Sequence, residues 1–512
     1  MSSTESKGGD NRPGIGGRLR EGAAQEVVDS AHVRELASVQ WLHQPMGQVD
    51  LAYGTMLADG GLLPSSVVPE LLGALLELEE MASSDFPYRP ELGDLYSNRL
   101  DFLHRRAPQA APWVSYGRPR REATTTAFLL ACRDGLLDLS EATLELARTL
   151  LEAARSHTRT SMPDYTYLQR AHPTSLAHYL STFVGPLVRD LDRIQLAFDH
   201  VDQSPGGAGS TNGSRLPLNR QNLAQWLGFG AVHPHPRDAM WQADTAIEVM
   251  AVATTSLTHG SRLAEDLLVW ASEEFGYLHL ADAHSRASVI MPHKKNPYSL
   301  TFVRGMARQS IGELAGVTAM QATATGQVDN RVGSYQMIPA GLETAARCCR
   351  LLASTLASAR FDTEIMEARA ARGFGAATDL AEIWVGESEI DPRQAHRWVG
   401  RAVRLAKQRG SQHRLDSGNP FTLELLREAA EGIAELPSHW TDEWLAETLH
   451  PSRIVESRTG LGGASEASVL EMQKAFQVSL DAKAEWCSAR RSALGTARLA
   501  LRRKARQLCR ST

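Results

Sequence analysis

Cysteine is scarce in this chain, whose 512 residues include five: Cys132, Cys348, Cys349, Cys487 and Cys509. Their odd number and spacing exclude a disulfide framework, fit no cysteine metal site and are typical of reduced thiols in a cytosol. Apolar runs long enough to span a bilayer are also absent, and the polar stretch from Met1 to Gly14 lacks the apolar core of a signal peptide. We therefore expect a cytoplasmic protein whose first residues form a disordered lead.

The chain also has no large excess of positive or negative charge. The chain has 54 Lys and Arg against 59 Asp and Glu, a formal net charge of -5. This balance argues against a general nucleic-acid binder and against a protein of the membrane surface. The length and the 43% hydrophobic content allow a large buried core and two or three domains. Small-molecule chemistry is therefore the better-supported class of function.

Strand signals are few, and Ala, Leu and charged residues predominate between short Gly- and Pro-rich turns, which is typical of helices. After Pro173, apolar residues recur at alternating spacings of four and three, which predicts one long helix with a continuous apolar stripe. The stripe comprises Leu180, Val184, Leu187, Leu191, Ile194 and Phe198. Further long helices are predicted over residues 238–270 and 297–323. We expect an all-α protein with a central bundle of long helices.

Basic residues are concentrated near the carboxy terminus, where residues 482–512 hold nine Lys or Arg against one acid, Glu485. The composition indicates a basic helical tail. We expect a solvated helix face or a frayed extension, with a contact to a partner or polyanion as the alternative.

The most informative segment is residues 285–297, Ser-Arg-Ala-Ser-Val-Ile-Met-Pro-His-Lys-Lys-Asn-Pro. Elimination beside a carboxylate needs a base for a weakly acidic C–H group and cations for the charge that builds on the carboxylate, and this segment offers both. Asn296 before Pro297 is typical of an N-cap and first helical residue, so we expect the loop to enter a helix whose positive end favours anions. A plain helix start with a solvated lysine is the alternative, but it does not explain the whole Met-Pro-x-Lys-x-Asn pattern.

This segment resembles the signature loop of the fumarase/aspartase superfamily, in its argininosuccinate lyase branch. Other landmarks of that family resemble residues 116–120, 165–173, 261–276, 376–381 and 457–463, so the resemblance covers roughly residues 16–475. It implies a mostly helical, three-domain subunit and a homotetramer with a twenty-helix core, in which each active site combines three chains. We place the domains at 1–115, 116–363 and 364–480, followed by the basic tail at 481–512.

The resemblance also implies roles for single residues. Ser288 falls at the catalytic serine. Substrate contacts are implied for Lys294, Asn296, Thr166 and Arg120. Arg121 and Glu122 stand where argininosuccinate lyases carry an Asn-Asp pair, and Tyr96 stands at or next to a usual histidine. An arginine at position 121 suits an additional carboxylate, nitro or phosphonate group, with a surface arginine as the alternative.

Two departures from the family change the expected mechanism. Tyr167 stands where the family has the histidine that helps to protonate the leaving group, and Thr301 replaces the glutamate that partners that histidine. General-acid help is worth about a hundred- to ten-thousand-fold in rate, so this chain must obtain it elsewhere or not need it. Tyr167 or His172 could donate the proton. The alternatives are a packed aromatic for Tyr167 and a locally satisfied helix start for His172.

The family's contacts to the arginine part of the substrate are also altered. They align with Val328, Gly333 and Gln336, so the arginine half of the site is not retained. Because this alignment can slip by a residue or two, the candidates for specificity are Asn330, Arg331, Tyr335 and Gln336.

Together these features predict a lyase that forms fumarate by β-elimination from a succinyl-type substrate such as an N-substituted aspartate. The expected leaving group is not arginine but an unusual amine, or a stable anion such as nitrite that leaves without a proton. The alternatives are a true argininosuccinate lyase, which releases L-arginine, and a non-catalytic structural or binding paralogue. No metal, nucleotide or redox cofactor is expected, and the glycine-rich residues 206–210 are expected to form a surface loop near the mouth of the site.

Overall fold

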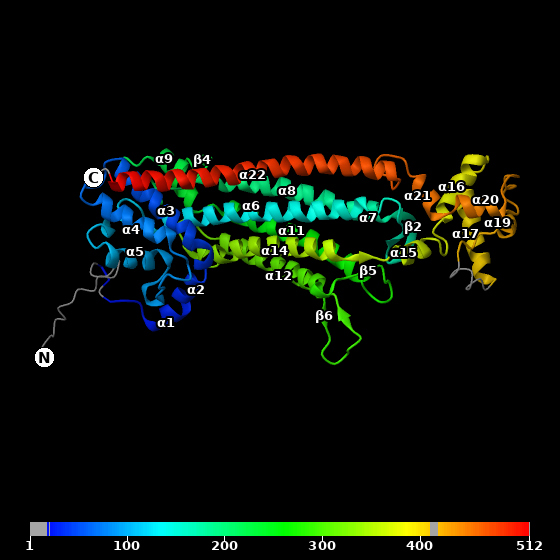
Figure 1. The fold of residues 1–512 in the computed structure, drawn as a ribbon, viewed down its shortest axis with the longest axis horizontal. Helices are drawn as coiled ribbons and strands as arrows, with labels where there is room; N and C mark the ends of the chain where they lie inside the picture. The colour runs from blue at the N-terminus through cyan, green and yellow to red at the C-terminus, as the bar shows by residue number, and fades with distance from the viewer. Residues whose placement is uncertain (1–17, 20, 410–417, 511–512) are drawn as a thin grey trace.

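The computed structural model describes residues 18–19, 21–409 and 418–510. The molecule is elongated, with a helical domain at each end and long helices along the middle (Figure 1). The predicted all-α fold with a central long-helix bundle is confirmed. The expected disordered lead, Met1 to Gly14, lies outside the described residues.

Five long helices form the central bundle. They are α6 (Arg120–Arg155), α8 (Val184–Val201), α11 (Ala243–Trp270), α12 (Tyr298–Gln321) and α14 (Ser334–Ser358). α14 packs along α6 and α11, and α11 packs along α12. The predicted apolar stripe is buried throughout. A break at residues 182–183 divides its expected single helix into α7 (Leu176–Ser181) and α8.

Shorter helices form the amino-terminal domain. They are α1 (Gln25–Val27), η1 (Val28–His32), α2 (Val33–Leu36), α3 (Val39–Asp59), α4 (Val68–Glu80), η2 (Pro90–Leu92), α5 (Leu95–Arg106) and η3 (Ala111–Ser115). A buried ionic cluster joins this domain to the bundle, because Asp50 of α3 accepts hydrogen bonds from Arg99 of α5 and from Arg118, each at 2.7 Å. This cluster fixes the position at which α6 begins.

The carboxy-terminal domain has an aromatic core of its own, built around the buried Trp384, Trp398 and Trp440. Its helices are α15 (Thr363–Ala370), α16 (Ala377–Glu387), α17 (Pro392–Gln408), α19 (Leu423–Ala430), α20 (Asp442–Thr448) and α21 (Pro451–Glu456). Arg458 donates a 2.5 Å hydrogen bond to Asp379. This ion pair joins two of the family landmarks read from the sequence.

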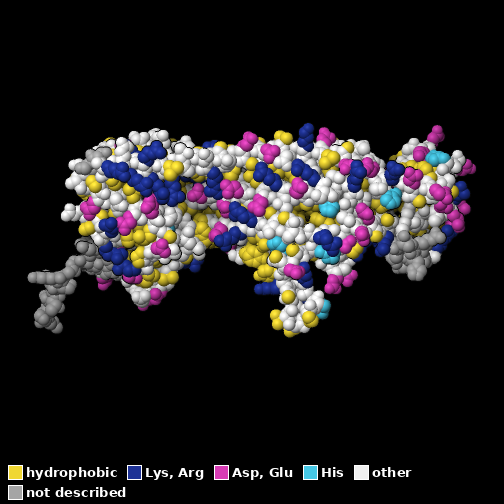
Figure 2. All heavy atoms as spheres, viewed as in Figure 1, with side chains coloured by type: hydrophobic (Ala, Val, Ile, Leu, Met, Phe, Trp, Pro, Cys, Tyr) yellow, Lys and Arg dark blue, Asp and Glu magenta, His cyan; other side chains and the backbone are white. Residues whose placement is uncertain are grey.

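The last helix, α22 (Glu466–Arg510), corrects the expected boundary at residue 480 and the separate tail. It runs unbroken back along the bundle to the amino-terminal domain (Figure 1). Its basic residues line the surface there (Figure 2), and Arg498 and Arg502 pair with Glu79, whose side chain is 1% exposed. The tail is neither frayed nor merely solvated, because its arginines neutralise a carboxylate that is costly to bury unpaired.

Short strands and turns complete the chain. The strand pairs are β1 (Ser161–Thr166) with β2 (Gln169–Ser175), β3 (Gln203–Ser204) with β4 (Ala231–Val232), β5 (Leu278–His279) with β8 (Arg360–Phe361), and β6 (Arg286–Ala287) with β7 (Lys295–Asn296). The remaining short helices are α9 (Arg220–Trp226), α10 (Pro236–Met240), η4 (Asp282–His284) and α13 (Asp329–Val332). The hairpins β1–β2 and β6–β7 carry the predicted catalytic residues.

Candidate active site

The β1–β2 hairpin presents Thr166 and Tyr167 to solvent. Thr166 pairs with Gln169, so the turn contains only Tyr167 and Leu168, and both have φ of 54°. Two positive φ values in succession are typical of the hairpin turn that favours Asn-Gly, and they strain bulky residues. Tyr167 is 99% exposed. The alternative interpretation, in which Tyr167 is an aromatic side chain packed inside its own subunit, is therefore wrong.

His172 lies in β2 and not at the start of a helix, which corrects that expectation. Its side chain is exposed and lies close enough to Asp379 for its charge to affect that carboxyl. Burial raises the pKa of Asp379, while Arg458 and His172 oppose the shift. The structure thus brings His172 near a buried carboxylate in the carboxy-terminal domain.

The β6–β7 hairpin holds the signature loop. The Ser288 N–H donates to the Lys294 carbonyl at 3.3 Å, and Ser288 Oγ accepts a 3.1 Å hydrogen bond from the Met291 N–H. The loop projects from the body of the molecule (Figure 1). Val289 and Ile290, which follow Ser288, are exposed. Lys294 is exposed. The loop therefore displays its polar groups away from the chain that carries it.

Asn296 does not cap a helix. It lies in β7, its side-chain amide donates to the Arg286 carbonyl at 2.9 Å, and α12 begins two residues later, at Tyr298. The expected N-cap is therefore replaced by a hydrogen bond that closes the base of the signature loop.

At the start of α6, Arg120 and Arg121 have different environments. The Arg120 side chain is 51% exposed and donates to Ser97 Oγ at 3.1 Å. Arg121 is buried, and its guanidinium donates to the Met240 carbonyl at 2.6 Å and to Asn330 Oδ1 at 3.0 Å. Its hydrogen bonds hold segments of its own chain together, so it does not present the free cation that the sequence suggested.

Glu122 corrects the expectation of a glycine-rich surface loop. The N–H groups of Gly207 and Gly209 donate to its carboxylate at 2.7 and 2.6 Å. Both glycines have positive φ, which lets successive N–H groups converge on one anion. Residues 206–208 are buried. An internal carboxylate therefore occupies this nest.

Tyr96 is also internal. It is 5% exposed, and its ring lies beside the Arg118 guanidinium, 5.6 Å from ring centroid to Cζ. Its hydroxyl has no hydrogen-bond partner among the described residues. Burial raises the pKa of this hydroxyl.

The α13–α14 segment packs against the first turns of α6. Arg331 donates to Thr124 Oγ1 at 3.1 Å, and the Tyr335 hydroxyl lies 2.8 Å from Thr125 Oγ1. Gln336 is half-buried on the same turn as Tyr335. Sequence reasoning missed two carboxylates that face this segment, Glu35 and Asp94. Asp94 could have been found as the N-cap of α5, whereas no sequence signal marks Glu35.

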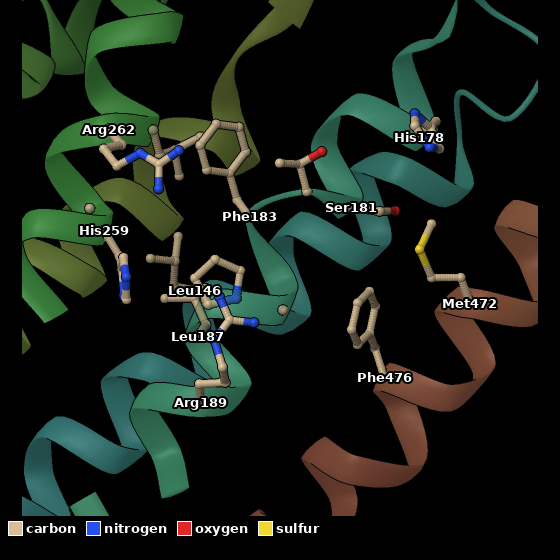
Figure 3. A pocket seen from close by; sticks show the side chains of 15 residues that line it. Leu146, His178, Ser181, Phe183, Leu187, Arg189, His259, Arg262, Met472 and Phe476 are labelled. Atoms are coloured by element: carbon tan, nitrogen blue, oxygen red, sulfur yellow. The ribbon is translucent and has the colours of Figure 1, made fainter. Parts of the chain in front are cut away.

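A separate pocket between α7, α8, α11 and α22 contains none of the predicted site residues (Figure 3). Its largely apolar wall includes His259, whose Nδ1 lies 2.7 Å from Asp190 Oδ2. Within the residues that the structure describes, no group of three or more His, Cys, Asp or Glu side chains is placed to hold a metal ion. No helix in the same part of the chain has the length and hydropathy to cross a membrane.

The predicted site residues come together in three groups along one chain: the β1–β2 tip, the signature loop, and the start of α6 with α13–α14. α6 has 36 residues, and its two ends are separated by about 54 Å at 1.5 Å per residue. The β1–β2 hairpin follows one end and Arg120 begins the other (Figure 1). A single chain therefore does not bring these groups to one point.

The long-helix fold and a projecting signature loop define a class of helical lyases, and comparisons with known proteins agree. Residues 91–312 match a family model described as "Lyase". The chain is 32% identical to argininosuccinate lyase from Methanoculleus marisnigri, over 94% of this chain and 96% of that protein. It is 31% identical to argininosuccinate lyase from Symbiobacterium thermophilum, over 82% of this chain and 88% of that protein.

A solved structure of an EDDS lyase variant with bound fumarate is also similar, with a TM-score of 0.84, 25% identity and coverage of 96% of this chain and 97% of that one. The chain belongs to the fumarase/aspartase superfamily, in its argininosuccinate lyase-like branch. It is a carbon-nitrogen lyase of this fumarate-forming group.

Proposed function

We propose that this lyase releases fumarate from an N-substituted aspartate, or a related succinyl-type substrate, with a leaving group other than arginine. The observation that carries the proposal is the retained signature loop with Ser288, combined with the loss of the acid pair at Tyr167 and Thr301. Thr301 Oγ1 donates to the Pro297 carbonyl at 3.2 Å and offers no carboxylate that could orient an acid.

Ser288 acts as the base in this mechanism. Its Oγ takes the proton from Cβ, the C–H electrons form the new double bond, and the bond from Cα to the leaving group breaks. The Met291 N–H, 3.1 Å from Oγ, stabilises the negative charge of the reactive alkoxide. Lys294, exposed in the same loop, supplies a cation for the substrate carboxylate as it gains charge.

Two residues are candidates to protonate a departing amine. Tyr167 lies at a strained and fully exposed tip, where it can enter the site of another subunit. His172 lies near Asp379, whose carboxylate can orient its imidazole. Replacing each in turn, as Tyr167→Phe and His172→Gln, separates the two roles, because only loss of the true acid flattens the basic limb of the pH profile of kcat.

A homotetramer with sites shared between three chains supports this chemistry. The length of α6 keeps the start of that helix far from the β1–β2 tip, and the projecting signature loop has apolar residues at its tip. Substrate contacts proposed for Arg120, Thr166, Lys294 and Asn296 therefore meet only when chains assemble. Sedimentation velocity at several protein concentrations tests the assembly.

A second candidate is argininosuccinate lyase itself, which the relatives at 31–32% identity favour. The decisive experiment monitors fumarate by ultraviolet absorbance when the pure protein is given argininosuccinate, a panel of N-substituted aspartates, and nitrosuccinate. Fumarate from another panel member but not from argininosuccinate supports the proposal. Fumarate from argininosuccinate alone overturns the proposed leaving group, and no fumarate from any compound overturns the proposed reaction.

A further inference from the structure

The pocket between α7, α8, α11 and α22 has a volume of about 360 Å³ (Figure 3). Its position follows from Pro186, whose ring would clash with the carbonyl of residue 182 if one helix continued through both. The chain therefore breaks between α7 and α8. Gly185 adds no side chain, although a Cβ there would make only ordinary contacts, 3.5 Å from Arg189 Nη1 and 3.7 Å from Phe476 Cζ. The break and the glycine together keep the pocket open.

Most of the pocket wall is apolar. Its larger apolar residues are Leu146, Phe183, Leu187, Leu263, Met472 and Phe476. A volume of this size lies within the range of small-molecule sites, whose walls are mostly apolar as well. The pocket can therefore bury a short alkyl chain or a single ring.

The titratable residues that line the pocket are all Arg or His. Arg189 projects from α8, and His259 and Arg262 lie three positions apart on α11, so they share one face of that helix. No Asp or Glu lines the pocket within the part of the chain that the structure describes. Neither guanidinium has a hydrogen bond or an ion pair with the described residues. The pocket therefore combines an apolar wall with cations that lack a protein partner.

The two histidines differ in what they offer a ligand. His259 Nδ1 lies 2.7 Å from Oδ2 of the buried Asp190. This contact fixes the ring and leaves Nε2 without a hydrogen-bond partner among the described residues. In His178, by contrast, Nε2 bonds the Gly462 carbonyl and Nδ1 lies near Thr174 Oγ1, each at 3.1 Å. His178 is therefore part of the wall, whereas His259 presents a free ring nitrogen.

We infer that this pocket binds a small organic carboxylate with an apolar body, such as a medium-chain fatty acid. Arg262 and His259 bind the carboxylate at the α11 side, and Arg189 adds a second guanidinium from α8. The apolar chain extends toward Met472 and Phe476 of α22, which lie on the opposite side of the pocket (Figure 3). None of the residues proposed for the elimination lines the pocket, so this inference goes beyond that reaction and does not rest on it.

The test is isothermal titration calorimetry of the intact protein with butanoate, hexanoate and octanoate. Each additional buried CH2 should tighten binding about two- to fourfold, because burial of a methylene group favours binding by up to that factor. Hexan-1-ol and hexylamine have the same chain length as hexanoate but lack the carboxylate. They should bind at least about tenfold more weakly than hexanoate.

Charge and space in the pocket are removed separately. Arg262→Gln and Arg189→Gln should each weaken hexanoate about three- to tenfold, and the double variant should bind hexanoate no better than hexan-1-ol. Arg397→Gln, on the exposed face of α17, is the matched control and should leave Kd unchanged. Gly185→Leu fills the pocket while keeping both arginines, and it should abolish binding. Thermal unfolding verifies that each variant is folded.

The outcomes decide the inference without reference to fumarate release. If hexan-1-ol or hexylamine binds as tightly as hexanoate, or the arginine variants bind hexanoate like the native protein, the pocket does not select carboxylates and the inference is overturned. It is also overturned if no carboxylate of the series binds, or if Gly185→Leu leaves binding unchanged. Either failure leaves the proposed elimination untouched, and failure of the elimination leaves these measurements valid.

Discussion

The projecting hairpins and the start of α6 are built in opposite ways. The β1–β2 tip and the signature loop expose Tyr167, Lys294 and the flank of Ser288, and their hydrogen bonds are local. At the start of α6, by contrast, Arg121 and Glu122 are bonded to segments more than 80 positions away along the chain. The contrast indicates that the groups proposed for proton transfer lie on projecting hairpins, whereas Arg121 and Glu122 form a rigid frame beside the proposed substrate contact Arg120.

The largest expected effect is on catalysis at the signature loop. Ser288→Ala removes the base and should lower kcat by at least about a hundred- to ten-thousand-fold, with little change in unfolding temperature because the loop is exposed. Ser358→Ala at the end of α14 is a control with the same chemical change, and it should retain activity. Near-normal turnover by Ser288→Ala would assign the base to another residue.

The contrast also predicts that inactive subunits can complement each other. Ser288→Ala and Arg120→Ala should each be nearly inactive. If the proposed homotetramer forms, tetramers assembled from a mixture of the two should regain a measurable fraction of native kcat, because some sites then contain two intact contributions. The measurement is fumarate release after the chains are exchanged, with each variant treated alone as the control. No recovery in tetramers shown to be mixed would mean that Ser288 and Arg120 serve the same site from one chain.

Arg120 and Arg121, which are neighbours at the start of α6, should differ in how much each contributes to the free energy of unfolding. Arg121→Ala leaves the Met240 carbonyl and Asn330 without their donor, and should lower the free energy of unfolding by about 2–4 kcal/mol. Arg120→Ala, on the half-exposed side chain, should lower the free energy of unfolding by less than about 1 kcal/mol while leaving the enzyme nearly inactive. Urea unfolding of both variants checks this, and equal losses of stability would mean that Arg120 is as structural as Arg121.

Sequence periodicity was sufficient for features whose signal is local. The expected helices at 238–270 and 297–323 correspond to α11 and α12, with bounds off by a few residues, whereas the stripe from Leu180 to Phe198 is helical and buried but is divided between α7 and α8. Each is set by apolar spacing along a few turns, which one segment carries by itself. The β1–β2 hairpin was missed because Tyr167 and Leu168 are not the residues that favour a turn with two positive φ values.

Long-range contacts lay beyond sequence reasoning. Arg121 was expected to face substrate, but the carbonyl that accepts its shortest hydrogen bond is 119 residues away. The Arg498 and Arg502 guanidiniums meet Glu79 more than 400 residues away, so the tail gave no local sign that it was structural. The placement of Glu35 in a cleft with Asp94 and Arg331 likewise depends on how the domains pack.

The smallest expected effect is on stability at the strained turn of the β1–β2 hairpin. It tests whether this hairpin, unlike the start of α6, holds its residues in an unfavourable conformation. Leu168 is mostly exposed and has φ of 54°, so Leu168→Gly removes strain without leaving a cavity and should raise the free energy of unfolding by about 1 kcal/mol. Val289→Gly is the control, because Val289 is also exposed but is not among the positive-φ residues, and glycine there should bring no gain.

Thermal unfolding and kcat are measured for both variants. Together they show whether the strain in this turn contributes to catalysis. If Leu168→Gly stabilises the chain and lowers kcat, the strain holds Tyr167 in the orientation that the reaction needs, and stability is given up for that orientation. If stability rises with kcat unchanged, the strain is incidental and His172 becomes the better candidate for the acid. A fall in stability would contradict the strained turn itself.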